Sequence, residues 1–127
     1  MDITIYYEDT DSTGIVYHAN YLKYCDRARS KYFFENNITL ENTNGHLTIH
    51  SLECKYVAPA KLGDKLIVQS TISRLKKTSI EIKHIILLEN KLIFQMSIKM
   101  LYVVNMKPYI FPDQMLKMFK LILKDSE

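Results

Sequence analysis

The stretch NYLKYCDRARSKYFF, residues 20–34, decides the fold class. Its apolar side chains recur every three or four positions, which places them along one face of an α-helix. A helix of this length with an aromatic face is expected to be wrapped by another element rather than to lie on a surface. The apolar face consists of Tyr21, Leu22, Cys25, Ala28, Tyr32 and Phe33, and the polar face of Lys23, Arg27, Ser30 and Lys31.

The wrapping element is predicted to be a β-sheet. DITIYY, residues 2–7, alternates polar and apolar residues and indicates a first strand. Four further strand-like runs cover residues 46–58, 64–76, 78–88 and 91–104, and alternation is clearest in the last of them. In residues 46–58 the apolar positions change from odd to even numbers between Ile49 and Leu52. Such a one-residue slip predicts a β-bulge, which bends the strand.

Short turns separate the four later runs. LGDK carries Gly63, and KKT and ENK mark the next two turns, so these strands are expected to be sequential antiparallel neighbours. From Pro112 the helical spacing returns and predicts a second, shorter helix. We therefore expect one domain over residues 1–127, of the α+β class, in which a curved antiparallel sheet of about five strands wraps a long central helix. The apolar positions of the second helix are Met115, Leu116, Phe119 and Ile122.

Such a sheet covers the helix on one side and leaves an edge strand open. A small domain with an open edge is stabilised when two copies pair their sheets, so a homodimer or homotetramer is expected.

The composition limits the classes of protein to which the chain can belong. The chain has 127 residues, 47% hydrophobic and 24% charged, which is typical of a globular domain. A net charge of +3 is too small to suggest a nucleic-acid-binding protein. No window of the sequence suggests a membrane span, and residues 1–10 do not resemble a secretory signal. Cys25 and Cys54 have no metal-type spacing, which favours two reduced thiols and a cytoplasmic location.

The segment EDTDSTGIVYHAN, residues 8–20, joins the first strand to the long helix. Asp9 and Asp11 lie just ahead of a helix start, where free backbone N–H groups and the helix dipole favour negative charge. A carboxylate beside such donors can act on a carbonyl group, because the donors stabilise an oxyanion while the carboxylate serves as base or nucleophile. Helix capping and simple solvation are the alternatives. Only one imidazole, that of His18, is nearby, so a metal site is not expected.

The longer stretch DTDSTGIVYHANYLKYCDRAR resembles the signature of the 4-hydroxybenzoyl-CoA thioesterase family in the hot-dog superfamily. Within that family it is most similar to the bacterial acyl-CoA thioesterases associated with the Tol–Pal cell-envelope system. The similarity continues in ECKYVAPAKLGDKL, residues 53–66. The resemblance implies the hot-dog fold, in agreement with the helix and strands predicted from periodicity.

The resemblance also implies roles for individual residues. Asp11 would be the catalytic carboxylate, either activating water or attacking the thioester carbonyl. His18 would lie at the helix start and polarise that carbonyl. Tyr7 and Tyr17 would line the site or donate hydrogen bonds, although packed aromatic side chains are an equal alternative. Asp9 is interpreted as a structural acid of the loop, and Asn20 as a helix cap, while Gly14 permits a turn or a close approach to substrate.

Coenzyme A would bring phosphate groups to the site. A basic turn in the middle of the chain is a candidate for binding them, with simple solvation as the alternative. Lys61 and Lys65 flank a second turn. No nucleophile elbow is present, and His46, His50 and His84 are interpreted as structural. The candidate phosphate-binding residues of the basic turn are Arg74, Lys76, Lys77, Thr78 and Ser79.

The sequence thus predicts an acyl-CoA thioesterase that needs no cofactor, since coenzyme A is part of its substrate. The thioester of an acyl carrier protein is an alternative substrate. A non-catalytic acyl-CoA-binding or envelope-associated interaction module is the main alternative function. A hot-dog dehydratase is a third interpretation, but the motif characteristic of those enzymes is missing.

Overall fold

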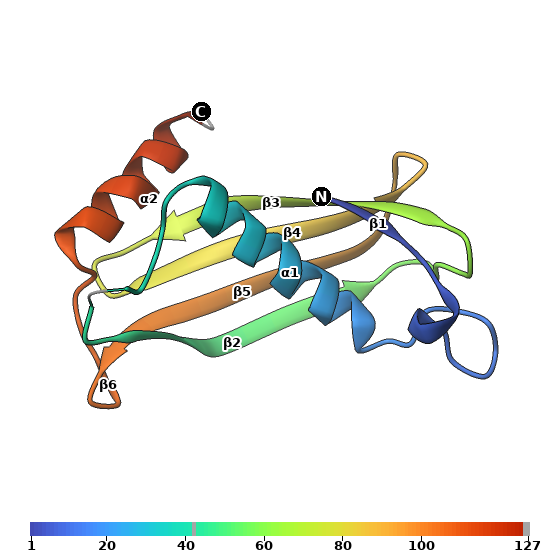
Figure 1. Cartoon of the computed structure of the whole chain (residues 1–127), viewed down its shortest axis with the longest axis horizontal. Helices are drawn as coiled ribbons and strands as arrows, with labels where there is room; N and C mark the ends of the chain where they lie inside the picture. The colour runs from blue at the N-terminus through green and yellow to red at the C-terminus, as the bar shows by residue number, and fades with distance from the viewer. Residues whose placement is uncertain (42, 126–127) are drawn as a thin grey trace.

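The computed structural model describes residues 1–41 and 43–125, and it has the α+β architecture expected from the sequence (Figure 1). The first strand is shorter than predicted, because the chain turns into a single 3₁₀ turn, η1, after Thr4 and Ile5. The four long strands and both helices lie where periodicity placed them, and the two-residue strand β6 was not predicted. The elements are β1 (Asp2–Thr4), η1 (Tyr7–Asp9), α1 (Asn20–Glu35), β2 (His46–Tyr56), β3 (Lys65–Leu75), β4 (Ser79–Leu88), β5 (Lys91–Val104), β6 (Lys107–Pro108) and α2 (Asp113–Asp125).

The strands form one antiparallel sheet in the order β1-β3-β4-β5-β2, and β6 pairs with β5. The expectation that all four long strands are sequential neighbours is therefore wrong for β2, which pairs with β5 and not with β3. The connection 57–64 is the reason. Instead of folding back as a tight hairpin, it crosses the start of α1, where Val16 N–H donates to the carbonyl oxygen of Ala60 (2.8 Å).

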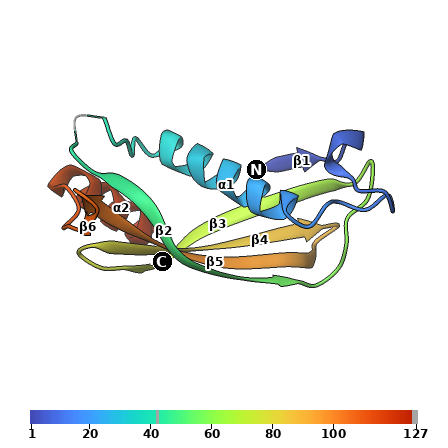
Figure 2. The same ribbon diagram turned by 90° about the horizontal axis from the view of Figure 1, so that it is seen from below.

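The sheet is bent at irregular positions. The register of β2 against β5 shifts between Ile49 and Ser51, which confirms the bulge predicted from the slip in the apolar pattern. Further shifts lie at Ile72/Arg74 in β3 and at Ile86/Leu87 in β4. Bulges bend and twist a strand, and they contribute to the curvature with which the sheet follows α1 (Figure 2).

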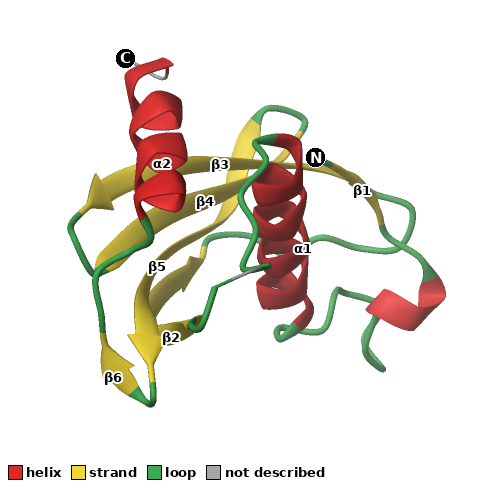
Figure 3. Ribbon diagram, turned by 60° about the vertical axis from the view of Figure 1, so that its left-hand side comes forward, coloured by secondary structure: helices red, strands yellow, loops and turns green. Residues whose placement is uncertain are grey.

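The core lies between α1 and the concave face of the sheet. Cys25 and Ala28 of α1 are buried there, and burial raises the pKa of the Cys25 thiol to about 12. The prediction that the aromatic side chains of this helix are buried is confirmed for Tyr21, whereas Tyr32 is only half-buried. Helix α2 lies at the opposite end of the sheet from the start of α1 (Figure 3). There the Phe119 ring contacts Phe33 (centroids 5.8 Å apart) and Phe111 (5.3 Å). The sheet residues of the core include Ile80, Ile82, Ile86, Phe94, Met96, Ile98 and Met100.

A polar network is buried in the same layer. Arg29 of α1, 6% exposed, donates from Nη1 to Nε2 of His84 on β4 (3.2 Å) and pairs with Asp26. Because a guanidinium can only donate, Nε2 must be the acceptor and the proton of the neutral ring sits on Nδ1. That N–H donates to Ser70 Oγ (2.7 Å). The network therefore requires a neutral His84, and burial, followed by the charge of Arg29, lowers its pKa to about 4.

We predict that this network makes the fold sensitive to acid. The unfolded chain binds a proton at His84 near pH 6.5, whereas the folded chain does so only near pH 4, so stability is lost as the pH falls between these values. Lowering the pH from 7.5 to 5 should reduce the free energy of unfolding in urea by roughly 2 kcal/mol through this one group. The groups facing His84 are Arg29, with its partner Asp26, from α1 and Ser70 from β3.

The matched variant is His84→Gln, which removes the titrating ring. It should be less stable than the parent at neutral pH but should lack most of the loss between pH 6.5 and 5. An unchanged acid dependence in His84→Gln would show that other groups cause it.

Candidate active site

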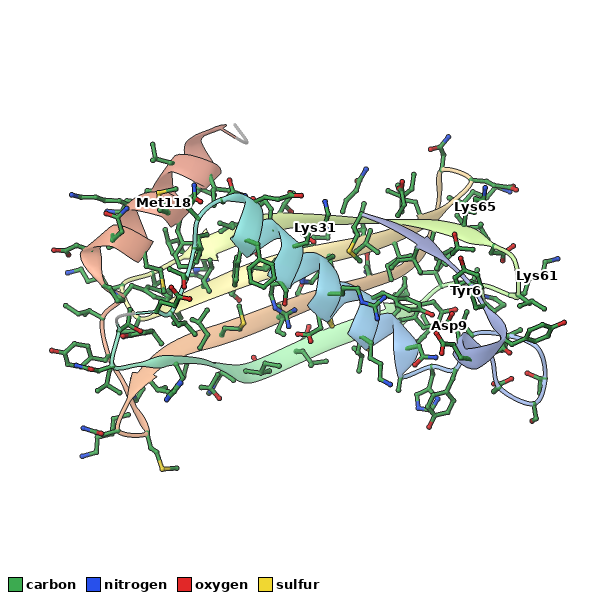
Figure 4. All side chains as sticks on the ribbon, viewed as in Figure 1. Tyr6, Asp9, Lys31, Lys61, Lys65 and Met118 are labelled. Carbon is green, nitrogen blue, oxygen red and sulfur yellow. The ribbon has the colours of Figure 1, made fainter. Side chains whose placement is uncertain are left out.

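The loop of residues 5–18 lies at one end of the sheet and is fastened to the 57–64 connection. Ile5 N–H donates to the carbonyl oxygen of Asp64 (2.9 Å), and Gly63 N–H donates back to that of Ile5 (2.9 Å). Isolated bridges join Thr10 to Val16 and Ile15 to Lys61. Tyr6, Asp9, Lys61 and Lys65 accordingly lie at the same end of the molecule (Figure 4).

Asp9 fastens this loop to α1. Its Oδ1 accepts the hydroxyl of Tyr24 (2.7 Å) and its Oδ2 accepts Tyr6 N–H (2.9 Å). The carbonyl oxygen of Asp9 also accepts Tyr17 N–H (2.9 Å) and Asn20 Nδ2 (2.8 Å). Burial, and then the bond to Asp9, raises the pKa of Tyr24, which stays protonated and donates. These bonds support the structural interpretation of Asp9.

Asn20 does not cap the helix as expected. It is the first helical residue, and the N-cap is Ala19, which has no capping side chain. The side chain of Asn20 instead donates to the loop, as described above. The start of α1 is therefore held by loop contacts rather than by a capping hydroxyl or carboxylate. Asn20 N–H donates to the carbonyl oxygen of Tyr17 (2.9 Å), and no capping side chain covers the neighbouring N–H groups.

Asp11 lies at the base of a tight turn. Its N–H donates to the carbonyl oxygen of Ile15 (2.9 Å), and its own carbonyl oxygen accepts Gly14 N–H (3.1 Å). Gly14 has φ of +85°, a conformation that strains other residues, and no atom lies within 4 Å of a Cβ built there. Within the chain, then, Gly14 is required by the backbone conformation of the turn and not by lack of space for a side chain.

The Asp11 carboxylate is held through one oxygen only. Oδ1 accepts the hydroxyl (2.6 Å) and the N–H (2.8 Å) of Thr13. These two bonds, the hydroxyl first, hold the pKa of Asp11 below its ordinary value, and the backbone N–H of Ile15 and the charge of His18 add to the lowering, so the group is ionised at neutral pH. No described residue hydrogen-bonds Oδ2. One oxygen of the carboxylate is thus fixed by two short bonds, and the other makes no direct hydrogen bond of this kind and can act on a ligand.

A cavity of about 330 Å³ opens beside the start of α1. Its lining is mainly apolar and aromatic, and it suits an acyl group better than a charged one. The Tyr21 ring forms part of the wall, and its hydroxyl accepts Ala60 N–H (3.0 Å). The lining residues include Ile15, His18, Tyr21, Tyr56, Val57 and Pro59.

The structure brings some of the predicted site residues together. Asp11, Gly14, Tyr17 and His18 belong to the one loop, and the Tyr17 and His18 rings are in contact (centroids 4.5 Å apart). Tyr7 is in the same loop, but its side chain is 81% exposed and does not line the cavity.

Sequence reasoning missed Tyr21 and Tyr56 as cavity residues. Tyr21 was assigned only to the buried face of the helix. Tyr56 belongs to the even-numbered apolar positions of β2, a signal that it faces α1.

The predicted basic turn lies elsewhere in the chain. Arg74 lies near the far end of β3, about 30 Å from Lys65 for a strand rise of about 3.3 Å per residue, and Lys76 and Lys77 follow that end. Arg74 lies near Glu81 (3.9 Å) and Ser79 is buried. Within one chain, this turn and Asp11 therefore do not form a common site. Thr78 also belongs to the turn, and its carbonyl oxygen accepts Tyr102 N–H (3.0 Å).

The structure offers no rival catalytic pair or metal centre among its described residues. Ser70 and His84 were not expected to meet, but the tautomer of His84 makes it a donor to Ser70 and not a base for it. No group of three or more potential metal ligands gathers in residues 1–41 and 43–125. Neither described helix has the length and apolar character needed to span a membrane.

Comparison with known proteins shows the family of the chain. A family model described as the thioesterase superfamily matches residues 13–92, a range that begins two residues after Asp11. An acyl-CoA thioesterase, YbgC, of Helicobacter pylori is 51% identical over 77 residues, which cover 61% of this chain and 58% of that protein. An acyl-CoA thioesterase, YbgC, of Haemophilus influenzae is 33% identical over 118 residues, covering 88% of this chain and 87% of that protein.

Solved structures extend the comparison to the fold. A Staphylococcus aureus protein in complex with CoA superimposes with a TM-score of 0.90 at 16% identity, covering 98% of this chain and 82% of that one. At such low identity the likeness concerns the fold alone, which is the hot-dog fold. The family match over most of the chain, together with the YbgC relatives, shows that the chain belongs to the thioesterase superfamily.

Proposed function

We propose that this protein hydrolyses acyl-CoA thioesters to a free acid and the CoA thiol, with no metal or other cofactor. The observation that carries the proposal is the Asp11 carboxylate, held through Oδ1 in the loop before α1, with Oδ2 free. The aromatic cavity beside His18 supplies a place for the acyl group. Relatives described as acyl-CoA thioesterases, and the CoA complex of the Staphylococcus protein, support the choice of substrate.

The chemistry requires few groups. A thioester carbonyl is less stabilised by resonance than an ester or amide. As base, Asp11 takes a proton from water while that water attacks the carbonyl carbon, and the C–S bond then breaks to release the thiolate, which takes up a proton. As nucleophile, Asp11 forms a mixed anhydride as the thiolate leaves, and water hydrolyses it. In either route the N–H groups at the start of α1 and the His18 side chain stabilise the oxyanion.

We further propose that the working site is built from two copies of the chain. Strand β2 is an outer strand of the sheet, all of its residues except Leu47 are exposed, and Ile49 and Leu52 are among them. A two-fold copy paired along β2 would run antiparallel. Its opposite end, which carries the basic turn of Arg74 and Lys77, would then come to the side of this chain's Asp11 loop. That turn, with Lys61 and Lys65, would face the phosphates of CoA.

The acyl carrier protein thioester remains a second substrate within this proposal, since the cavity contacts the acyl part alone. We place the reaction in the cytoplasm, in keeping with two free cysteines. A binding module that leaves acyl-CoA intact is the rival function. It is favoured by the bonds from Thr13, which make the Asp11 carboxylate a weaker base.

The first prediction from this proposal concerns Asp11. Asp11→Asn keeps the size of the side chain but removes its charge and basicity, so turnover of a susceptible acyl-CoA should fall at least about 100-fold. The Asp11 side chain is partly exposed, and the Oδ1 of Asn can still accept both bonds from Thr13, so the melting temperature should change little. Thiol release from a panel of short, aromatic and long acyl-CoAs measures the effect.

Asp9→Asn is the matched control for Asp11→Asn. It should lower stability but keep most of the turnover per folded molecule. A well-folded Asp11→Asn protein with near-normal turnover would contradict the role of Asp11. A parent protein that binds every acyl-CoA of the panel and hydrolyses none would favour the binding module.

The second prediction concerns the edge of β2. Ile49→Asp places a charge on the exposed edge strand and should shift the protein from a dimer or larger assembly toward monomer, with loss of turnover. Light scattering at micromolar concentration, with Lys83→Asp on β4 as the control, measures the shift. A parent protein that is a stable and active monomer would contradict the two-copy site.

A further inference from the structure

Tyr56, the last residue of β2, is joined to the start of α1 across 38 positions of sequence. Its hydroxyl donates to the carbonyl oxygen of His18 (2.8 Å). Its ring stands edge-on to His18 (centroids 6.5 Å apart, planes at 74°). No other hydrogen bond from a β2 side chain reaches the loop or the helix start among the described residues. Tyr56 therefore links the edge strand directly to the candidate site.

The ring of Tyr56 packs against two buried aromatic rings. Phe94 is fully buried and Tyr21 is 3% exposed, and Tyr56 packs edge-on against both (centroids 5.0 and 5.7 Å apart). Tyr21 and Phe94 are themselves stacked (5.2 Å, planes at 15°). Tyr56 is still 47% exposed, so its ring is anchored while its hydroxyl reaches toward His18 at the edge of the cavity.

The N-cap residue of α1 and the side chain of His18 have few other contacts that orient them. Ala19, the N-cap residue, has no side chain to hold it, and no described residue hydrogen-bonds the imidazole of His18. The ring packs against the aromatic rings of Tyr17 and Tyr56, and its charge acts on Asp11. The packing that orients His18 therefore comes from its own backbone and from these two rings.

The bond to the His18 carbonyl also acts on the next N–H group. A peptide unit is planar, so holding the carbonyl oxygen of His18 fixes the direction of Ala19 N–H. Donation to a carbonyl oxygen also polarises the peptide and makes its N–H a stronger donor. Ala19 N–H is one of the groups at the helix start that the proposed function uses to stabilise an oxyanion.

We propose that Tyr56 is a positioning residue for thioester hydrolysis, whose hydroxyl orients the His18–Ala19 peptide and whose ring orients the His18 imidazole. This inference rests on the proposed function. The hydroxyl acts on the oxyanion site through the backbone, and the ring acts through packing. The two contributions can be separated by substitution.

Tyr56→Phe removes the hydroxyl and keeps the ring. Its kcat should fall about 10-fold while KM and the melting temperature stay close to those of the parent, because geometry at the reacting carbonyl is disturbed and acyl binding is not. Tyr56→Leu should lose more activity, since His18 also loses its ring contact. Tyr32→Phe, a half-buried tyrosine in the last turn of α1 and away from both proposed binding regions, is the control and should keep parental kinetics.

A second measurement does not depend on turnover. In Tyr56→Phe, the amide resonance of Ala19 should shift, whereas Tyr32→Phe should leave it unchanged. An active parent with unchanged kcat in Tyr56→Phe, or an unchanged Ala19 amide, would overturn the inference and leave the proposed function standing. A parent that hydrolyses no acyl-CoA would overturn both.

Discussion

The candidate site depends on a carboxylate for which we propose no chemical step. Asp9 joins the 3₁₀ turn, through Tyr6 N–H, to the second turn of α1, through the hydroxyl of Tyr24. Its backbone carbonyl oxygen holds Tyr17 and Asn20 at the helix start. This anchor adds to the bridges that join the loop to itself and to the 57–64 connection. It contributes to the stability with which the turn that carries Asp11 and the cavity beside His18 are held next to α1.

The rest of the site follows from how the sheet holds the helix. The concave face buries Cys25 and Ala28, so α1 cannot slide or rotate, and its start is fixed at one end of the molecule. The 57–64 connection crosses that end and supplies Pro59 and Ala60, while β2 supplies Tyr56. Two neighbouring carboxylates thereby have different environments. Asp9 has both of its oxygens occupied, whereas Asp11 keeps one free.

The spacing of apolar residues predicted those features of the fold that depend on residues close together in the sequence. The limits of α1 and the bulge after Ile49 followed from the spacing of apolar residues, and the recognised motif placed Asp11 and His18 in one loop. Strand order did not follow, because the path of the 57–64 connection depends on contacts with Val16 and Ile15 that no local pattern records. The Arg29–His84–Ser70 network was missed for the same reason, since its members come from three elements. Asn20 was misassigned because a polar residue at a helix start usually caps the helix.

The central claim is that Asp9 anchors the loop through Tyr24, and a double-mutant cycle tests it directly. The free energy of unfolding is measured for the parent, Asp9→Asn, Tyr24→Phe and the double variant. If the two groups act through one bond, each single change should destabilise the protein, and the double variant should be little worse than either, a coupling of about 1 kcal/mol or more. Strictly additive losses, with no coupling between the two positions, would contradict the account.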